Sequence, residues 1–317
     1  MRPTPEQFAS LSRLERVAFE LADFFARPTL TPLSTTWNSA FMGALIYSSG
    51  GRRLNVQGLE TLQAYSKKES VLFVANHRSF FDFFTITALC YWRTPLTKRI
   101  FFPVRQTFFY THPAGPLVNA VMSGMRMFPP VMREKEKKAF NQYTVERCIE
   151  ELNRTDIGTI LGMHPEGTRN KNPDPYSFLP AQPGVGRIAL GVTSRTKVIP
   201  VFVLGMSQSI QGEMKKNAFA PGAHPVDAYF GKPIDFDDLR PKAAMITAQK
   251  KAADRCLDAI KALAEQQRRD AAIREGRDPD AEPPVSERPP VQHIPRRAPE
   301  SMQPSADAYP RHRAFFA

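Results

Sequence analysis

Short apolar runs alternate with amphipathic segments from about residue 53 of the chain onward. Continuous apolar runs of about four to eight residues are typical of strands buried on both faces, and apolar positions roughly three to four residues apart are typical of helices. The patterns predict strands over 54–57, 71–75, 99–104, 127–131, 157–164, 198–205 and 226–231, and helices over 80–92, 134–153, 185–195 and 241–267. This alternation predicts a single α/β domain with a mixed, largely parallel β-sheet flanked by helices.

Residues 1–51 carry apolar side chains at helical spacing instead. They predict an amphipathic helix over 5–25 and a second, more apolar helix over 36–48. Two interpretations of this N-terminal helical pair stay open: packing on the domain, or lying in a membrane interface. The uncharged segments 28–51 and 106–125 contain polar residues, prolines and glycines that make spanning a bilayer costly. The chain start has no apolar signal-peptide core, which predicts a cytoplasmic location.

The composition changes again after about residue 268. Nine prolines fall in residues 268–317, together with mixed charges and few aliphatic side chains. Such a segment buries too little apolar surface to offset the entropy lost on ordering it, which predicts disorder. The chain is therefore divided into an N-terminal helical element over 1–51, a central domain over 52–267 and a Pro- and Arg-rich tail over 268–317.

The chain of 317 residues has a formal net charge of +12 and a pI near 9.8. The tail contributes one positive charge, since its nine arginines face eight acidic residues, whereas residues 91–140 hold nine Lys or Arg against two Glu. A basic body indicates an anionic partner, and no RNP-like or helix-turn-helix signature supports nucleic acid. The three cysteines are far apart without CxxC spacing, which argues against a disulfide framework and a zinc site.

His77 and Asp82 stand in the most apolar part of the central domain, VLFVANHRSFFDFF at 71–84. Positions five apart lie on different faces of a helix, so the pair can meet only if His77 lies in the turn before a helix and Asp82 in its first turn. Ser79 and Asp82 also fit a capping box with a helix start at Ser79, in which Asp82 only satisfies helix amides. In the chemical alternative, Asp82 fixes the imidazole tautomer while His77 removes a proton from a hydroxyl.

Polar residues also crowd the turn HPEGTRN at 164–170, directly after a predicted strand. Arg169 can clamp a phosphate with two parallel hydrogen bonds, and the turn amides of Gly167 and Thr168 can add donors. A solvated loop is the alternative for this segment. Glu166 belongs to the same turn.

Two further segments attract notice. In MRMFPPVMRE, 125–134, Arg133 follows a short extended piece, where it suits an anionic head group or is an ordinary surface cation. In VIPVFV, 198–203, Pro200 interrupts a strand-like run. Proline cannot donate a ladder hydrogen bond, so we expect Pro200 at a strand end or a bulge.

Taken in order, the four segments resemble the blocks of the glycerolipid acyltransferase family, the lysophosphatidate and glycerol-3-phosphate acyltransferases. The resemblance covers about residues 52–235 and rests on four blocks: His77–Asp82, Phe128–Arg133, Pro165–Arg169 and Val198–Val201. The chain departs from the family at His164, where an aromatic such as Phe commonly precedes the PEG, and around Gln182, where a basic residue is common. Both departures leave the identity of the acceptor open.

The resemblance implies that His77 is the base that deprotonates an acceptor hydroxyl for attack on an acyl thioester. It implies that Asp82 orients His77 and stabilises its imidazolium, and that Pro200 lies on the acyl-donor side. It also implies acceptor binding by five residues of the two middle blocks: Arg133, Glu166, Gly167, Thr168 and Arg169. No metal or bound cofactor follows from it, because acyl-CoA or acyl-carrier protein serves as a co-substrate.

The implied reaction is O-acylation of a phosphate-bearing glycerolipid, with 1-acylglycerol 3-phosphate giving phosphatidate in phospholipid biosynthesis. Another lysophospholipid, a lyso-aminolipid and glycerol 3-phosphate stay open as acceptors. A non-catalytic basic protein that binds membranes or nucleic acid is the remoter alternative. The implied partners are the acyl donor, a lysophospholipid and an anionic membrane surface, without nucleic acid, at the cytoplasmic face of the membrane.

Overall fold

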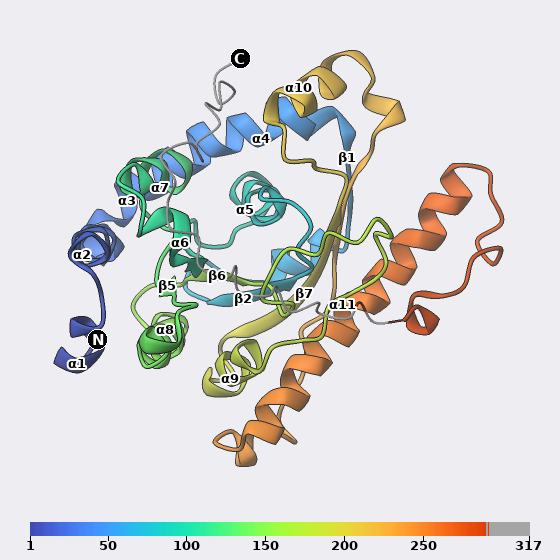
Figure 1. Cartoon of the computed structure of the whole chain (residues 1–317). Helices are drawn as coiled ribbons and strands as arrows, with labels where there is room; N and C mark the ends of the chain where they lie inside the picture. The colour runs from blue at the N-terminus through green and yellow to red at the C-terminus, as the bar shows by residue number, and fades with distance from the viewer. Residues whose placement is uncertain (290, 292–317) are drawn as a thin grey trace, which may run out of the picture.

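The computed structural model describes residues 1–289 and 291, and its centre is a six-stranded β-sheet (Figure 1). The strands lie in the order β1-β8-β7-β2-β6-β3. β8 runs antiparallel to β7, and the other neighbouring pairs are parallel, which confirms the predicted fold class. The bounds are β1 Leu54–Gln57, β2 Val71–Ala75, β3 Ile100–Phe101, β6 Ile160–Met163, β7 Lys197–Leu204 and β8 Val226–Phe230.

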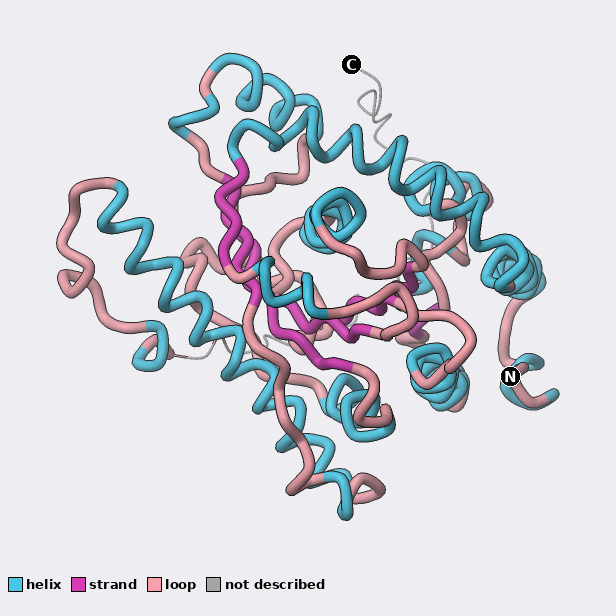
Figure 2. The backbone as a smooth tube through the Cα atoms, turned by 180° about the vertical axis from the view of Figure 1, so that it is seen from behind, coloured by secondary structure: helices cyan, strands magenta, loops and turns pink. Residues whose placement is uncertain are grey.

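Helices cover both faces of this sheet, as Figures 1 and 2 show from opposite sides. One layer consists of α8 Phe140–Leu152, α9 Pro183–Gly191 and α11 Ile246–Arg274. The other consists of α5 Asp82–Arg93, with α4 Gly43–Gly50 and α10 Ile210–Phe219 outside it. α5 lies close to the sheet because β6 contains Gly162, where a Cβ would fall 1.9 Å from the Phe83 ring.

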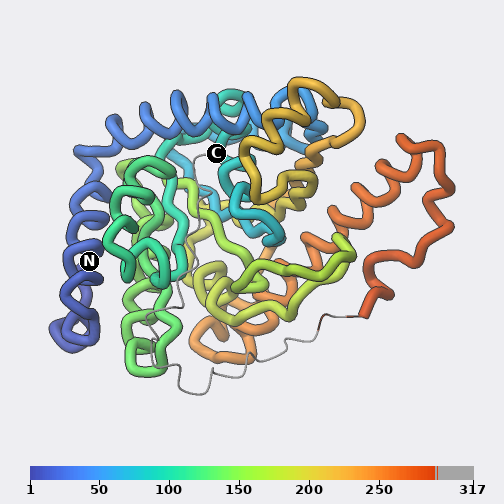
Figure 3. Tube along the Cα trace, turned by 45° about the horizontal axis from the view of Figure 1, so that its top comes forward, coloured from blue at the N-terminus to red at the C-terminus, as the bar shows by residue number. Residues whose placement is uncertain are grey.

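The N-terminal part contains more helices than the sequence predicted. Ser12 starts a new helix by capping it with Glu15, so the predicted helix over 5–25 is divided into α1 Pro5–Ala9 and α2 Arg13–Ala26. α3 Thr31–Trp37, a π-helical turn at Asn38–Met42 and α4 then follow without a break. Figure 3 shows these helices along one side and across the top of the domain. Within residues 1–289, none of the helices combines the length and the apolar character needed to span a membrane.

Other elements differ from the prediction for physical reasons. The run at 99–104 is divided between β3 and β4 Val104–Arg105, because β4 leaves the main sheet to pair with β5 Pro130–Val131. α6 Gln106–Phe109 and α7 Gly115–Ser123 arise from the uncharged segment 106–125, where polar and apolar positions do not alternate clearly. The apolar pattern did not predict α10 because the buried face of this helix is polar. Glu213 on that face pairs with Arg53 at 2.6 Å.

Pro200 contradicts the expectation of a strand end or bulge, since it lies inside β7 with Val74 of β2 opposite it. β7 and β8 pair from Val201 and Phe230 onward, and the carbonyl of Pro200 accepts from Gly231 N at 2.9 Å, just past the end of β8. The backbone N–H and C=O of one strand residue point toward the same neighbouring strand. The missing N–H of Pro200 therefore faces the point where β8 has ended, and no bond of the ladder is lost.

The C-terminal boundary predicted at 267 falls inside α11, which continues to Arg274. The following segment returns to the body through a buried Val285 and through Arg288, which donates to Asp174 at 2.7 Å. Residues 275–289 are therefore not the disordered segment that composition predicted, because a few anchors suffice to order it. Residue 290 and residues 292–317 of the predicted tail lie outside the described residues.

Candidate active site

The motif residues converge at the carboxyl ends of three neighbouring strands. His77 follows β2, His164 follows β6, and residues 205–208 follow β7, in a sheet where the order is β7-β2-β6. In open α/β sheets, ligands bind in the crevice outside this edge. The block around Arg133 reaches the same place through a hydrogen bond from its Nη2 to the carbonyl of Gly167 at 2.5 Å.

His77 and Asp82 are in contact, in the one arrangement that was expected to allow it at this spacing. Nδ1 of His77 lies 3.3 Å from Oδ2 of Asp82, with His77 in the turn and Asp82 as the first residue of α5. The expected helix start at Ser79 is wrong, because the Ser79 hydroxyl accepts from Phe81 N and holds a non-helical turn. Oδ2 of Asp82 accepts instead from the backbone amides of Arg78 and Ser79, each at 2.7 Å. This bonding fixes the carboxylate against the histidine.

Burial sets the charges of the pair. Asp82 is 2% exposed, and burial raises its pKa to about 6. Burial and then the nearby charge of Arg169 lower the pKa of His77 to about 3, although 22% of its side chain is exposed. At pH 7 the pair is therefore a carboxylate beside a neutral imidazole. Because a carboxylate only accepts, Nδ1 of His77 carries the proton and Nε2 keeps a lone pair for a substrate proton.

The turn after β6 is held by its backbone. The carbonyl of His164 accepts from Gly167 N at 2.9 Å, and Pro165 stands at the second position, which this turn favours. Gly167 has φ +66°, and a Cβ there would lie 2.9 Å from Cγ of Gln182. Only glycine fits without strain, so the turn has one shape and directs Glu166 inward.

Glu166 lies behind His77 rather than on an open face. Its carboxylate accepts from His77 N at 3.1 Å, from Leu179 N at 2.9 Å and from Asn170 Nδ2 at 3.2 Å. The side chain is 2% exposed, and burial raises its pKa. The family resemblance implies acceptor binding by Glu166; in the structure its carboxylate supports the backbone of His77.

Two exposed arginines border the site. Arg133 contacts Gly167 as described, and Nη1 of Arg169 donates to Oε1 of Gln208 at 2.7 Å. Thr168, which directly precedes Arg169 in the sequence, is half-buried. Among the described residues, neither arginine has a carboxylate partner within salt-bridge distance. Both guanidinium groups therefore retain donors for an anion.

Several residues of the site were not predicted. The imidazole of His164 lies parallel to that of His77, with ring centroids 4.0 Å apart. Asn76 extends the β2–β7 ladder by exchanging two 2.8 Å hydrogen bonds with the backbone of Val203. Asn76 and His164 adjoin the motif blocks, so proximity in sequence was a usable signal. Gln208 follows β7, and only the pairing of β7 with β2 brings it to the site.

A comparison with known families bears on this arrangement. Residues 53–204 match the family model described as Acyltransferase. These residues belong to the acyltransferase family. The matched region begins directly before β1 and ends with β7, so it contains the His77–Asp82 pair, Arg133 and the turn after β6. No curated protein matches the chain.

Membership fixes the general chemistry of the acyltransferase domain: O-acyl transfer to a lipid acceptor. The observed pair suits such a reaction, because a neutral imidazole with a free Nε2 can accept a hydroxyl proton, and a carboxylate on Nδ1 can hold its tautomer. The scattered thiols do not suit a nucleophile. Burial raises the pKa values of Cys90, Cys148 and Cys256, so all three are inert thiols at neutral pH.

Proposed function

We propose that the protein transfers a fatty acyl group from acyl-CoA or acyl-carrier protein to the free hydroxyl of 1-acylglycerol 3-phosphate, giving phosphatidate. The single observation that carries this proposal is the neutral His77 beside Asp82, bordered by Arg133 and Arg169. A base next to two free cations suits a substrate that has both a hydroxyl and a phosphate. Phospholipid biosynthesis is the setting that this product implies.

In the proposed reaction, Nε2 of His77 takes the hydroxyl proton while the oxygen attacks the thioester carbonyl carbon. A new C–O bond forms, the C–S bond breaks, and the thiolate leaves with the proton from the imidazolium. Asp82 keeps the ring in one orientation and stabilises its positive charge during the step. Glu166 acts indirectly, because it holds the backbone of His77 and not the substrate.

The phosphate of the acceptor is proposed to bind between Arg133 and Arg169, with the amides of Gly167 and Thr168 as further donors. Arg169 is near enough to lower the pKa of His77, so an anion bound there lies close to the reacting hydroxyl. Charge-assisted bonds to phosphate are the strong ones. The same chemistry accommodates other phosphate-bearing acceptors. Pro200 is buried inside β7, one position before Val201, which pairs with Ala75 of β2, so any effect of Pro200 on the acyl donor is indirect.

The proposal is tested by mixing the purified protein with one acyl-CoA, one acyl-carrier protein and a panel of acceptors, and measuring free thiol and acylated product. We expect turnover with 1-acylglycerol 3-phosphate above that with glycerol 3-phosphate and an uncharged monoacylglycerol. His77→Ala should abolish turnover while the thermal transition is kept. Normal turnover by His77→Ala would overturn the proposed mechanism.

Arg169→Ala should raise the KM for phosphorylated acceptors about tenfold, because a charge-assisted hydrogen bond to phosphate is lost. Arg195→Ala is the matched control: this arginine is exposed and precedes β7, at the opposite edge of the sheet. An unchanged KM in Arg169→Ala would remove Arg169 from phosphate binding.

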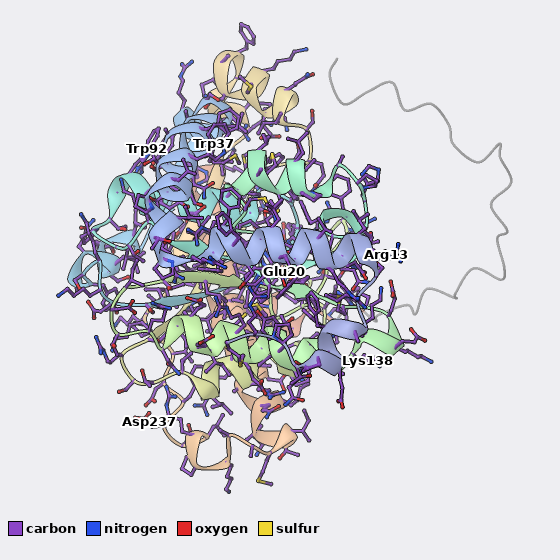
Figure 4. All side chains as sticks on the ribbon, turned by 90° about the vertical axis from the view of Figure 1, so that its left-hand side faces the viewer. Arg13, Glu20, Trp37, Trp92, Lys138 and Asp237 are labelled. Atoms are coloured by element: carbon purple, nitrogen blue, oxygen red, sulfur yellow. The ribbon has the colours of Figure 1, made fainter. Side chains whose placement is uncertain are left out.

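We also propose that the protein binds an anionic bilayer through one apolar face. Three neighbouring helices carry exposed apolar side chains at helical spacing: Val17, Leu21 and Phe24 on α2, Leu33 and Trp37 on α3, and Leu117 and Val121 on α7. Trp37 Nε1 donates to the carbonyl of Val121 at 2.8 Å, which joins α3 to α7. Figure 4 views this side, with α2 from Arg13 to Glu20 across the front and Trp37 above it. Arginines on α2 add attraction to anionic lipid.

Vesicle flotation tests this face. Leu21→Asp and Leu117→Asp should weaken binding to vesicles that contain phosphatidylglycerol, because each places a charge in the apolar contact. Ile273→Asp is the matched control, since Ile273 is 63% exposed on α11, on the other side of the molecule. Equal binding by all three variants would reject this face. Turnover of a short-chain, water-soluble acceptor should be kept in each.

A further inference from the structure

His164 occupies the position where the family commonly has an aromatic residue, and it contacts the candidate base directly. Its ring lies 4.0 Å from that of His77, with 7° between the planes. The two residues come from adjacent strands: His77 follows β2 and His164 follows β6, which pair in parallel register up to Val74 and Met163. The stack is thus a consequence of the sheet, not of sequence proximity.

The tautomer of His164 is determined by its partner. Nδ1 lies 3.0 Å from the carbonyl oxygen of Ala75, the last residue of β2. A carbonyl only accepts, so Nδ1 of His164 carries the proton. The bond caps β2 and prevents the imidazole from rotating. Burial keeps both rings neutral, since it lowers the pKa of His164 as well as that of His77.

The stack restrains a tilt of the His77 ring that the hydrogen-bond contacts of His77 do not block. Asp82 holds Nδ1 of His77 with a 3.3 Å contact, and Glu166 holds its backbone N–H at 3.1 Å. Neither contact prevents the ring from tilting about the axis through Nδ1. A parallel ring at 4.0 Å blocks tilting toward β6. The direction of the Nε2 lone pair depends on that tilt.

We propose that His164 is a positioning residue for His77. The fixed imidazole of His164 stacks against the ring of His77 and so orients Nε2 of His77 toward the acceptor hydroxyl. This inference rests on the proposed role of His77 as base. It assigns the departure from the family's usual aromatic to the orientation of the base and not to recognition of the acceptor.

Two substitutions separate the ring of His164 from its hydrogen bond. His164→Asn keeps an N–H that reaches the carbonyl of Ala75 but removes the ring. His164→Phe keeps the ring and removes the N–H. We expect kcat to fall about tenfold in His164→Asn, because a small misorientation of a catalytic base slows the reaction. The KM for both substrates should stay within about twofold. We expect His164→Phe to lose less than about threefold in kcat.

A spectroscopic measurement reports the stack itself. In protein with 13C-labelled histidine, the ring current of His164 should shift the His77 ring signals. The shift should persist in His164→Phe and disappear in His164→Asn. His224→Asn is the matched control, because His224 is an exposed histidine on the loop before β8. Thermal unfolding of each variant shows that the fold is kept.

Three results would overturn the proposal. Full kcat in His164→Asn would mean that the stack does not orient the base. Equal loss in both variants would assign the effect to the ring nitrogens. A raised KM at unchanged kcat would place His164 on a substrate. Failure of the proposed function is separate, since it would appear as normal turnover in His77→Ala whatever His164 does.

Discussion

Oδ2 of Asp82 is the oxygen that lies 3.3 Å from Nδ1 of His77, and it also accepts both amide bonds of the turn at 2.7 Å. One atom therefore fixes the turn and the imidazole together. Because a single oxygen makes all three contacts, a substitution that keeps this oxygen can separate the geometric role of the carboxylate from its charge.

Asp82→Asn can keep all three contacts, because a single amide oxygen can replace Oδ2. It removes the negative charge that stabilises the imidazolium. We expect kcat to fall about a hundredfold, within the usual range for acid–base catalysis, with stability little changed. Asp82→Ala should abolish turnover and lower the free energy of unfolding by about 1–3 kcal/mol for each amide left without an acceptor. Steady-state kinetics and urea unfolding measure both effects, and equal stability of the two variants would contradict this account.

Gly167→Ala tests the turn that directs Glu166 toward His77. The φ of +66° costs an alanine about 1–2 kcal/mol, and its Cβ would press on Gln182. We expect a lower melting temperature and a lower kcat, because movement of Glu166 releases the backbone of His77. Gly184→Ala is the matched control, since a Cβ there meets nothing within 4 Å and alanine favours the helix α9. A Gly167→Ala protein as active and stable as Gly184→Ala would contradict this role.

The neutral His164 predicts a pH dependence of stability. Burial lowers its pKa to about 3, whereas in the unfolded chain the pKa is about 6.5. As pH falls below 6.5, the unfolded chain gains a proton that the fold excludes, so acid favours unfolding. Asp82 acts oppositely, because its pKa is raised to about 6 and the fold holds its proton below that pH.

The contribution of His164 is isolated by comparison with His164→Phe, in which the other groups remain. Between pH 6 and pH 4.5, the free energy of unfolding of the natural protein should fall more steeply than that of the variant, by up to about 1.4 kcal/mol for each pH unit. Urea unfolding across this range measures the difference. Parallel curves would show that His164 takes up its proton equally in both states.

The segment after α11 braces the loop beside the site. Arg288 donates to Asp174 at 2.7 Å and lies over the ring of Tyr176, 5.1 Å from its centroid. The same loop supplies the amide of Leu179 to the carboxylate of Glu166. Loss of the brace should therefore loosen the support behind His77.

We expect Arg288→Ala to lower the free energy of unfolding by about 1 kcal/mol, as for a partly buried ion pair, and to reduce kcat several-fold. Arg277→Ala is the control, because Arg277 lies on the same segment but pairs with Glu275 and Glu282 instead of the loop. Hydrogen exchange of residues 170–179 should rise only in Arg288→Ala. Identical exchange in the two variants would show that Arg288 does not brace the loop.

Net charge was a weaker guide than the motifs. The basic stretch 91–140 includes Arg99 and Arg126, which are fully buried and face no outside partner. Arg99 Nη2 donates to Glu151 at 2.5 Å, and Arg126 donates to the carbonyl of Ala26 at the end of α2. Counting charges along the chain cannot distinguish such residues from surface cations, because burial depends on the packing of α2 against the core.

The sequence by itself determined the local features of this protein. It predicted β1 and β2 with their observed bounds. The continuous apolar run of β2 reflects burial on both faces, whereas β1 alternates apolar and polar residues and is only partly buried. It also brought His77 to Asp82, because both lie within one turn and the start of one helix. The tertiary structure decided what lies around that pair. Placing Glu166 behind His77, and His164 against its ring, required β6 to lie beside β2, and the order of strands in a sheet is set by crossovers that spacing along the chain does not record.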